Sequence, residues 1–318
     1  MRKHAAILLV VALGFAALTT GCTRCPDEEI DAIYASIPEP ATKHQAGDDL
    51  KGWTYAHITS EASKQTYYYY HMPSKKPDAP VFVLVHGMFL DGRTYLNFGP
   101  LAEDFELVAL ELPYSSPFYK GQVGDFPRLL QDFLDTMKLT RIYLGGVSLG
   151  GQIAMFYMVQ DPKTEVDGLA LISTDMVKNE EELDKAKKNI ERLLGLTDDD
   201  DRKMLCVLSK VVNWKKKRAG ESSKEVLDLF TYKKPSFYRQ VMYTGLNMKA
   251  PPKLEKIKVP TLIILGDADS TIEFDDAKPL VNHIPGAELK VIKDGEHDMA
   301  FTRADEVVPL LKEKFVPR

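Results

Sequence analysis

Between residues 80 and 174, short apolar runs alternate with longer helix-like stretches. The runs are rich in aliphatic and β-branched residues and are bounded by turn residues, as buried strands are. They lie at 80–87, 106–112, 141–146 and 167–174. The helix-like stretches lie at about 92–103, 126–137 and 148–160. Strands that alternate with helices of this length need crossover connections, so the pattern predicts an α/β fold: a mostly parallel sheet flanked by helices.

The sheet is expected to begin before this alternation and to continue after it. Two β-rich runs that come first predict an antiparallel hairpin, in which the run of tyrosines forms a strand with both faces covered. These runs are 53–58 and 66–72. Further strands and helices are expected near the C-terminus, at 259–270, 275–284, 287–299 and 302–315.

A charged, helix-rich block of about 80 residues separates the two parts of the expected sheet. We interpret it as an insertion that forms a helical lid over one edge of the sheet. The chain is therefore divided into a signal segment, an N-terminal tether, a two-part core and the lid. Their bounds are 1–21, 22–50, 51–174 with 259–318, and 175–258.

The first 21 residues have the composition of a signal sequence. Arg2 and Lys3 precede an apolar run, residues 5–18, that is too short to span a membrane comfortably. The segment resembles a bacterial lipoprotein signal, in which a small residue, here Gly21, precedes a lipid-modified cysteine, here Cys22. The resemblance implies fatty acyl chains, palmitate among them, on Cys22, and two or more such chains anchor a protein stably to a membrane.

The lipoprotein resemblance also suggests a location. Thr23 stands where an aspartate would direct retention in the inner membrane, so the outer membrane of a bacterial envelope is favoured. Ordinary secretion into the periplasm is the alternative, because Thr19 stands where these signals usually have leucine. Cys25 and Cys206 are the other two cysteines, and because they lie far apart in the sequence we predict no disulfide between them.

One serine, Ser148, lies where a predicted strand passes into a predicted helix, within the sequence G-x-S-x-G. In such a handover a sharp turn lifts the serine hydroxyl above the sheet. Gly146 and Gly150 are expected to be glycine because a side chain would collide with the neighbouring strand or helix. The helix directs its positive end at the serine, and the amide of Leu149 faces a developing oxyanion.

Two other glycine motifs do not fit this stretch. A phosphate-binding loop has lysine and then serine or threonine after its last glycine, but Gly151 and Gln152 follow Gly150. A dinucleotide-binding motif would need a glycine at the position of Val147. Presentation of a serine for chemistry is therefore the preferred interpretation.

With its serine motif, an earlier His-Gly after a strand, and a later acid and histidine, the chain resembles the α/β-hydrolase superfamily over residues 50–318. The resemblance implies a catalytic triad of serine, acid and histidine. It also implies two oxyanion donors, the amides of Met88, which follows His-Gly, and Leu149. The fold's dehalogenases and epoxide hydrolases use an aspartate nucleophile, so Ser148 weighs against both activities.

The family order selects the partners of the serine. His297 lies just past the last strand, where the family places its histidine, and it is the expected base. Asp269 lies three residues after a strand-ending glycine and is the expected acid, whereas Asp175 stands where a minority of members have theirs. Asp298 is adjacent to His297, and sequence neighbours do not easily pair a ring with a carboxylate.

These residues predict acyl transfer to water, with a carboxylic ester or lipid-like ester as the first substrate class. Acyltransferase, thioesterase and carbon–carbon bond hydrolase activities use the same triad, and an inactive binding protein with this fold is a further alternative. No cofactor or metal is expected. The formal charge of −5 weighs against a nucleic-acid partner. The expected partners are a small ester and a membrane, and no protein partner is predicted.

Overall fold

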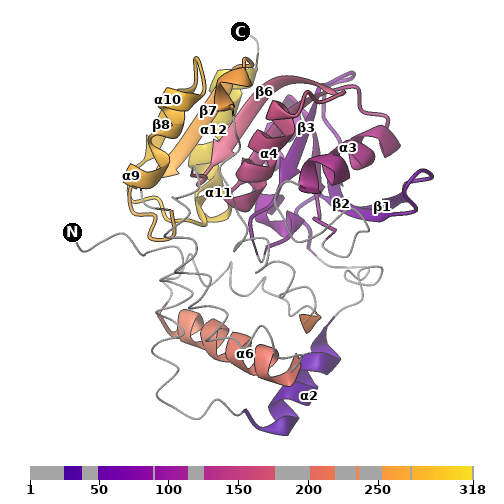
Figure 1. Ribbon diagram of the computed structural model, residues 1–318, viewed down its shortest axis with the longest axis vertical. Coiled ribbons are helices and arrows are strands. Elements are labelled where there is room, and N and C mark those ends of the chain that lie inside the picture. The colour runs from indigo at the N-terminus through magenta and orange to yellow at the C-terminus, as the bar shows by residue number, and fades with distance from the viewer. Residues whose placement is uncertain are drawn as a thin grey trace.

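The predicted sheet is present and has eight strands in the order β1-β2-β4-β3-β5-β6-β7-β8 (Figure 1). The strands are β1 (Thr54–Thr59), β2 (Thr66–Met72), β3 (Val81–Val85), β4 (Glu106–Leu110), β5 (Arg141–Val147), β6 (Glu165–Ile172), β7 (Thr261–Gly266) and β8 (Glu288–Ile292). Strands β1 and β2 pair antiparallel, and so do β2 and β4, while every other neighbouring pair is parallel. The predicted fold class and the predicted hairpin are therefore confirmed.

This structure is a computed structural model. It describes residues 25–37, 49–88, 90–113, 125–175, 201–218, 234–235, 253–272 and 274–316. The predicted signal segment, Cys22 and most of the predicted lid lie outside the described residues. Among the described helices, none is both long enough and apolar enough to cross a membrane.

Helices cover both faces of the sheet and enclose a core on each (Figure 1). One face packs against α3 (Phe126–Thr136), α4 (Leu149–Val159), η4 (Leu254–Lys256), α9 (Phe274–Ala277) and α10 (Leu280–His283). The other packs against η2 (Gly92–Glu103), α11 (Met299–Thr302) and α12 (Ala304–Phe315). The tyrosine strand β2 contributes to both cores, since Tyr67 is buried in the first and Tyr70 in the second.

Two of the expected helices differ from their predictions. The stretch expected as one helix at 275–284 forms two short helices, α9 and α10, with Pro279 at the start of the second. Proline lacks a backbone N–H and disfavours helix at the residue before it, so the helix is divided there. The C-terminal helix α12 begins at Ala304, after the short helix α11.

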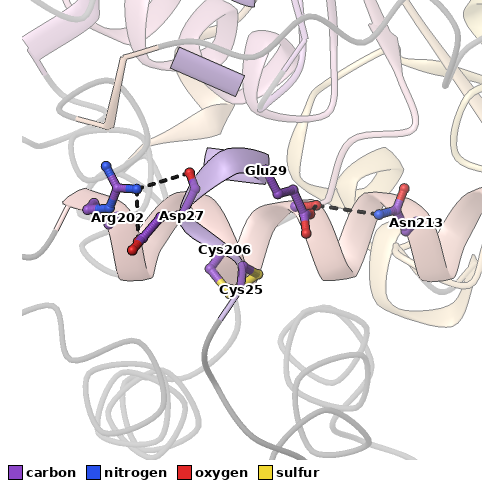
Figure 2. Close-up of a disulfide and its surroundings, with 7 residues drawn as sticks. Cys25, Asp27, Glu29, Arg202, Cys206 and Asn213 are labelled. Carbon is purple, nitrogen blue, oxygen red and sulfur yellow. Dashed lines mark hydrogen bonds and ion pairs between the residues drawn. A yellow bond between two sulfur atoms is a disulfide. The ribbon is translucent and has the colours of Figure 1, made fainter. Parts of the chain in front are cut away.

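The prediction of no disulfide is wrong. Helices α2 (Asp27–Ser36) and α6 (Asp201–Arg218) lie side by side (Figure 1), and Cys25 and Cys206 form a disulfide with their Cα atoms 5.6 Å apart (Figure 2). The two cysteines are 181 residues apart, but this separation does not determine their distance once α2 has docked on α6. The expected tether therefore includes a helix that is covalently joined to the inserted block.

Candidate active site

The predicted site residues follow successive strands at one edge of the sheet. Because parallel strands end at the same edge, the loops after them meet there, and this edge is the usual ligand site of α/β folds. The turn containing Met88 follows β3, Ser148 follows β5, Asp175 follows β6, Asp269 follows β7 and His297 follows β8. The topology thus brings together on one rim residues that are far apart in the sequence, from Met88 to His297.

Ser148 lies in a sharp turn between β5 and α4. Its backbone is left-handed, with φ 54° and ψ −118°, a conformation that non-glycine residues rarely adopt. At this turn α4 approaches the sheet closely: a Cβ added to Gly150 would lie 1.9 Å from the carbonyl oxygen of Val85. A Cβ on Gly146 would lie 2.2 Å from the carbonyl carbon of Gly150. Both glycines are therefore required for the steric reason predicted.

Asp269 and His297 are in contact. The Nδ1 atom of His297 lies 2.9 Å from Oδ2 of Asp269, whose side chain is 2% exposed. The other carboxylate oxygen accepts hydrogen bonds from the amides of Thr271 and Ile272, both 2.8 Å long. Because the carboxylate accepts, the ring donates from Nδ1, and the neutral ring then has Nε2 as its acceptor. The pairing of His297 Nε2 with Ser148 Oγ stays a prediction.

The alternative acid, Asp175, has a different partner. Its Oδ1 accepts a hydrogen bond of 2.9 Å from the side-chain amide of Gln152 on α4, and both residues are buried. Asp298, the other alternative, precedes α11 and lies within hydrogen-bond distance of the Thr302 hydroxyl. Sequence reasoning gave Gln152 no structural role, although a polar residue is unusual in an otherwise apolar helix.

The turn after β3 lies against Ser148. A Cβ added to Gly87 would be 3.4 Å from the Cβ of Ser148, which places the following residue, Met88, next to the serine turn. Leu149 is the first residue of α4, so its amide has no acceptor within the helix. Both predicted oxyanion donors thus lie in segments that adjoin Ser148.

His86 holds the turn after β3 in place. It is buried, and its Nε2 accepts the amide of Leu112 at 3.1 Å while its Nδ1 lies 2.7 Å from the carbonyl oxygen of Gly87. Since Nε2 accepts, the ring donates from Nδ1, and both nitrogens are engaged. His86 is therefore unsuited to act as the base.

The remaining described histidines lie elsewhere. His71 pairs with Glu106 at the start of β4, the opposite end of the strand from the rim. His57 lies on β1 against Tyr68, and His283 is exposed. His44 lies outside the described residues.

A half-buried tyrosine of β1, Tyr55, contacts the glutamate that follows β4, Glu111. The hydroxyl of Tyr55 donates a 3.0 Å hydrogen bond to Oε2 of Glu111. Burial, followed by the nearby Glu111 carboxylate, raises the pKa of Tyr55 far above its ordinary value. The phenol therefore stays protonated and donates to Glu111, which ties the hairpin to the loop that follows β4.

Comparisons with known proteins identify the class. The alpha/beta hydrolase family model matches residues 82–310, most of the chain, and the protein belongs to this family.

Within the described residues no group of three or more histidine, cysteine, aspartate or glutamate side chains is arranged to hold a metal ion.

Individual relatives are distant. A mouse protein, monoacylglycerol lipase ABHD6, is 25% identical over 282 residues, covering 81% of this chain and 80% of that protein. A membrane phospholipase A described as a bacterial virulence factor is 21% identical, with a TM-score of 0.60 over 96% of this chain and 95% of that one. Bromoperoxidase from Bacillus anthracis is 20% identical, with a TM-score of 0.67 over 83% of this chain and 100% of that one. At these identities the solved structures show the shared fold alone.

Proposed function

We propose that the protein is a serine hydrolase that cleaves a carboxylic ester through an acyl-enzyme formed on Ser148. The observation that supports this most is the contact between Asp269 and His297 on the rim that also presents a left-handed Ser148. A histidine oriented by a buried carboxylate is the arrangement that activates a serine hydroxyl, which is a weak nucleophile by itself.

In the proposed reaction His297 removes the proton of Ser148 Oγ, which attacks the carbonyl carbon of the ester. Asp269 stabilises the imidazolium that forms. The amides of Met88 and Leu149 bind the oxyanion, and loss of one such donor typically raises the barrier by about 3–4 kcal/mol. The imidazolium then protonates the leaving alcohol. Water, deprotonated by His297, releases the acyl group and regenerates the serine.

The substrate class is proposed from the names of similar proteins. The mouse relative is named a monoacylglycerol lipase, and one structural neighbour is a membrane phospholipase A. A lipid-like ester therefore is the preferred substrate, bound beneath a lid formed by the inserted block. Acyltransferase, thioesterase and carbon–carbon bond hydrolase activities remain the alternatives, because the same triad performs each.

We also propose export to the bacterial envelope, with a lipid anchor on Cys22. The disulfide supports this location because such bonds persist in oxidising compartments. Pairing of Cys25 with Cys206 uses two of the three cysteines, so that Cys22 alone is available for acylation. Fatty-acid labelling of wild type and Cys22→Ser in a bacterial host tests the anchor, and equal labelling of both would contradict it.

A fluorophosphonate probe tests the nucleophile. Wild type should be labelled, and Ser148→Ala should not. Ser209→Ala is a matched control, since its hydroxyl bonds Glu29 on α2, far along the chain from the serine turn, and it should label like wild type. An inert but folded wild type would favour the binding-protein alternative. A screen of ester chain lengths, with thioesters alongside and alcohols added as acceptors, then separates hydrolase from transferase.

A further inference from the structure

Ser148 is restrained by groups from the end of the neighbouring strand, β6. Its amide donates a 2.9 Å hydrogen bond to the carbonyl oxygen of Ile172. Its carbonyl oxygen lies 3.2 Å from the hydroxyl of Thr174, which is also 3.0 Å from the carbonyl oxygen of Ile172. The one hydroxyl proton of Thr174 is thus shared between two carbonyls, and one of them belongs to the left-handed serine.

A second left-handed residue lies immediately before Thr174. Ser173 has φ 46°, and its amide donates a 3.0 Å hydrogen bond to the carbonyl oxygen of Ile264 on β7. The chain therefore changes direction at Ser173 while it is still tied to the sheet. Thr174 is fully buried and lies close to α4: a Cβ added to Gly151 would be 2.1 Å from its hydroxyl oxygen. Glycine at 151 is what permits this approach.

Asp175 makes the next contact with the same helix. Its carboxylate accepts the Gln152 side-chain amide at 2.9 Å, with Asp175 3% and Gln152 1% exposed. Thr174 and Asp175 therefore hold the first turn of α4 at two successive points, the carbonyl of Ser148 and the side chain of Gln152. A buried polar contact of this kind fixes direction as well as distance.

We propose that Thr174 and Asp175 are positioning residues for Ser148. They restrain the serine carbonyl and the first helical turn, and through these the direction of Ser148 Oγ and of the Leu149 amide. Both are buried, and their side chains contact the carbonyl of Ser148 and Gln152 of α4, so in this proposal they act through Ser148. This inference rests on the proposed function, since it assigns a role in the reactivity of the same serine.

Thr174→Val is the informative substitution. It keeps the branched shape and removes the hydroxyl. The two carbonyls that lose it retain other donors: Ile172 keeps the amide of Ser148, and Ser148 keeps the amides of Gly151 and Gln152. No carbonyl is left unpaired, so the variant is expected to fold with little change in Tm.

The expected effect is on reactivity. A displacement of about 1 Å can slow an enzyme about 100-fold, so Thr174→Val should lower kcat on a p-nitrophenyl ester about 10- to 100-fold. The second-order rate of fluorophosphonate labelling should fall in parallel, while KM changes by less than about twofold. Thr174→Ser restores the hydroxyl and should recover kcat to within about threefold of wild type.

Thr164→Val is the matched control. Thr164 precedes β6 at the opposite end of the same strand, is 3% exposed, and its hydroxyl lies 3.2 Å from the carbonyl oxygen of Leu139. The control loses the same group from a similarly buried place, and its kcat and labelling rate should match those of wild type. Asp175→Asn, which weakens the acceptor for Gln152, should lower the labelling rate several-fold.

The outcomes separate this inference from the proposed function. A wild type that neither turns over esters nor reacts with the probe overturns both. An active wild type with an equally active, folded Thr174→Val overturns the positioning role alone, and so does a Thr174→Ser as slow as Thr174→Val. If Thr174→Val fails to fold, Asp175→Asn decides, since a folded variant with the wild-type labelling rate also overturns the role.

Discussion

The eight-stranded core and the α2–α6 pair are held together by different interactions. In the core, residues such as Phe82, Leu144 and Ile263 are fully buried between the sheet and the helices on its two faces. The α2–α6 pair has a few buried apolar residues, among them Ile30 and Ile33, and one disulfide. Arg202 also forms exposed ion pairs with two acids of α2, Asp27 and Asp31, and Figure 2 shows the contact with Asp27.

This contrast indicates which changes should destabilise each region. Burial of apolar surface is spread over many residues in the core, so its stability does not depend on one bond or on redox conditions. Exposed ion pairs contribute little, so the association of α2 with α6 depends mainly on the disulfide and on the burial of a few apolar residues such as Ile30 and Ile33. The two regions should therefore respond independently to substitutions and to reductant.

The largest effect is expected from a core substitution that leaves both regions folded. Asp269→Asn keeps the size of the side chain but should stabilise the wrong tautomer of His297, so kcat is expected to fall about 10⁴-fold. Steady-state kinetics on an ester, with thermal unfolding of the same sample, checks this. A variant within tenfold of wild type would mean that Asp269 is not the acid.

Reduction of the disulfide should loosen the α2–α6 pair and leave the eight-stranded core unchanged. A bond that closes a loop of 181 residues stabilises by at most about 5 kcal/mol through chain entropy, so its loss should greatly weaken the docking of α2. Hydrogen exchange of α2 amides should accelerate in reductant, while β5 and β6 stay protected. Cys25→Ser is the control, because its exchange should not respond to reductant. Equal acceleration in the strands would show that the regions are coupled.

Gly150→Ala should damage the core without loosening α2. The added methyl would lie 1.9 Å from the carbonyl oxygen of Val85, and since both groups are backbone-fixed, the free energy of unfolding should fall by about 3 kcal/mol or more. Gly99→Ala is the comparison, since a Cβ there meets only the Met72 side chain at 3.7 Å. Urea unfolding measures both, and equal midpoints would contradict the steric explanation.

The smallest effect is expected at the exposed ion pairs. Arg202→Ala removes hydrogen bonds to Asp27 and Asp31, yet the arginine is 44% and Asp27 90% exposed. The docking of α2 should therefore weaken only slightly while the disulfide is intact. Exchange rates of α2 amides as fast as those of the reduced protein would show that these pairs matter more than exposure suggests.

Much of the fold is predictable because its signals are local. The run of tyrosines predicted at 66–72 is β2 with the same bounds, and the runs at 106–112 and 141–146 are strands shifted by at most two residues at their ends. Each is a short apolar run that must be buried wherever it packs. The helix expected at 275–284 was predicted less well, because Pro279 divides it.

The residues of the candidate site were predictable one by one, but their contacts were not. The order of Ser148, Asp269 and His297 along the chain placed each of them after a strand, and these strands are β5, β7 and β8. The structure shows the Asp269–His297 contact. The family position already favoured Asp269 over Asp175, and the structure pairs Asp269 with His297 and Asp175 with Gln152. The sequence did not predict the contact of the Thr174 hydroxyl with the carbonyl of Ser148. Its one sequence feature is that Thr174 lies in a polar triplet after a buried strand.

The sequence by itself determined the alternation of strands and helices, and with it the parallel sheet and the presence of a serine at the end of β5. These follow from side-chain periodicity and backbone sterics, which act within a few residues. Only the tertiary structure decided that Asp269 faces His297, that Thr174 reaches the carbonyl of Ser148, and that Cys25 meets Cys206. Contacts between distant segments depend on how whole elements pack, and sequence spacing does not encode that distance.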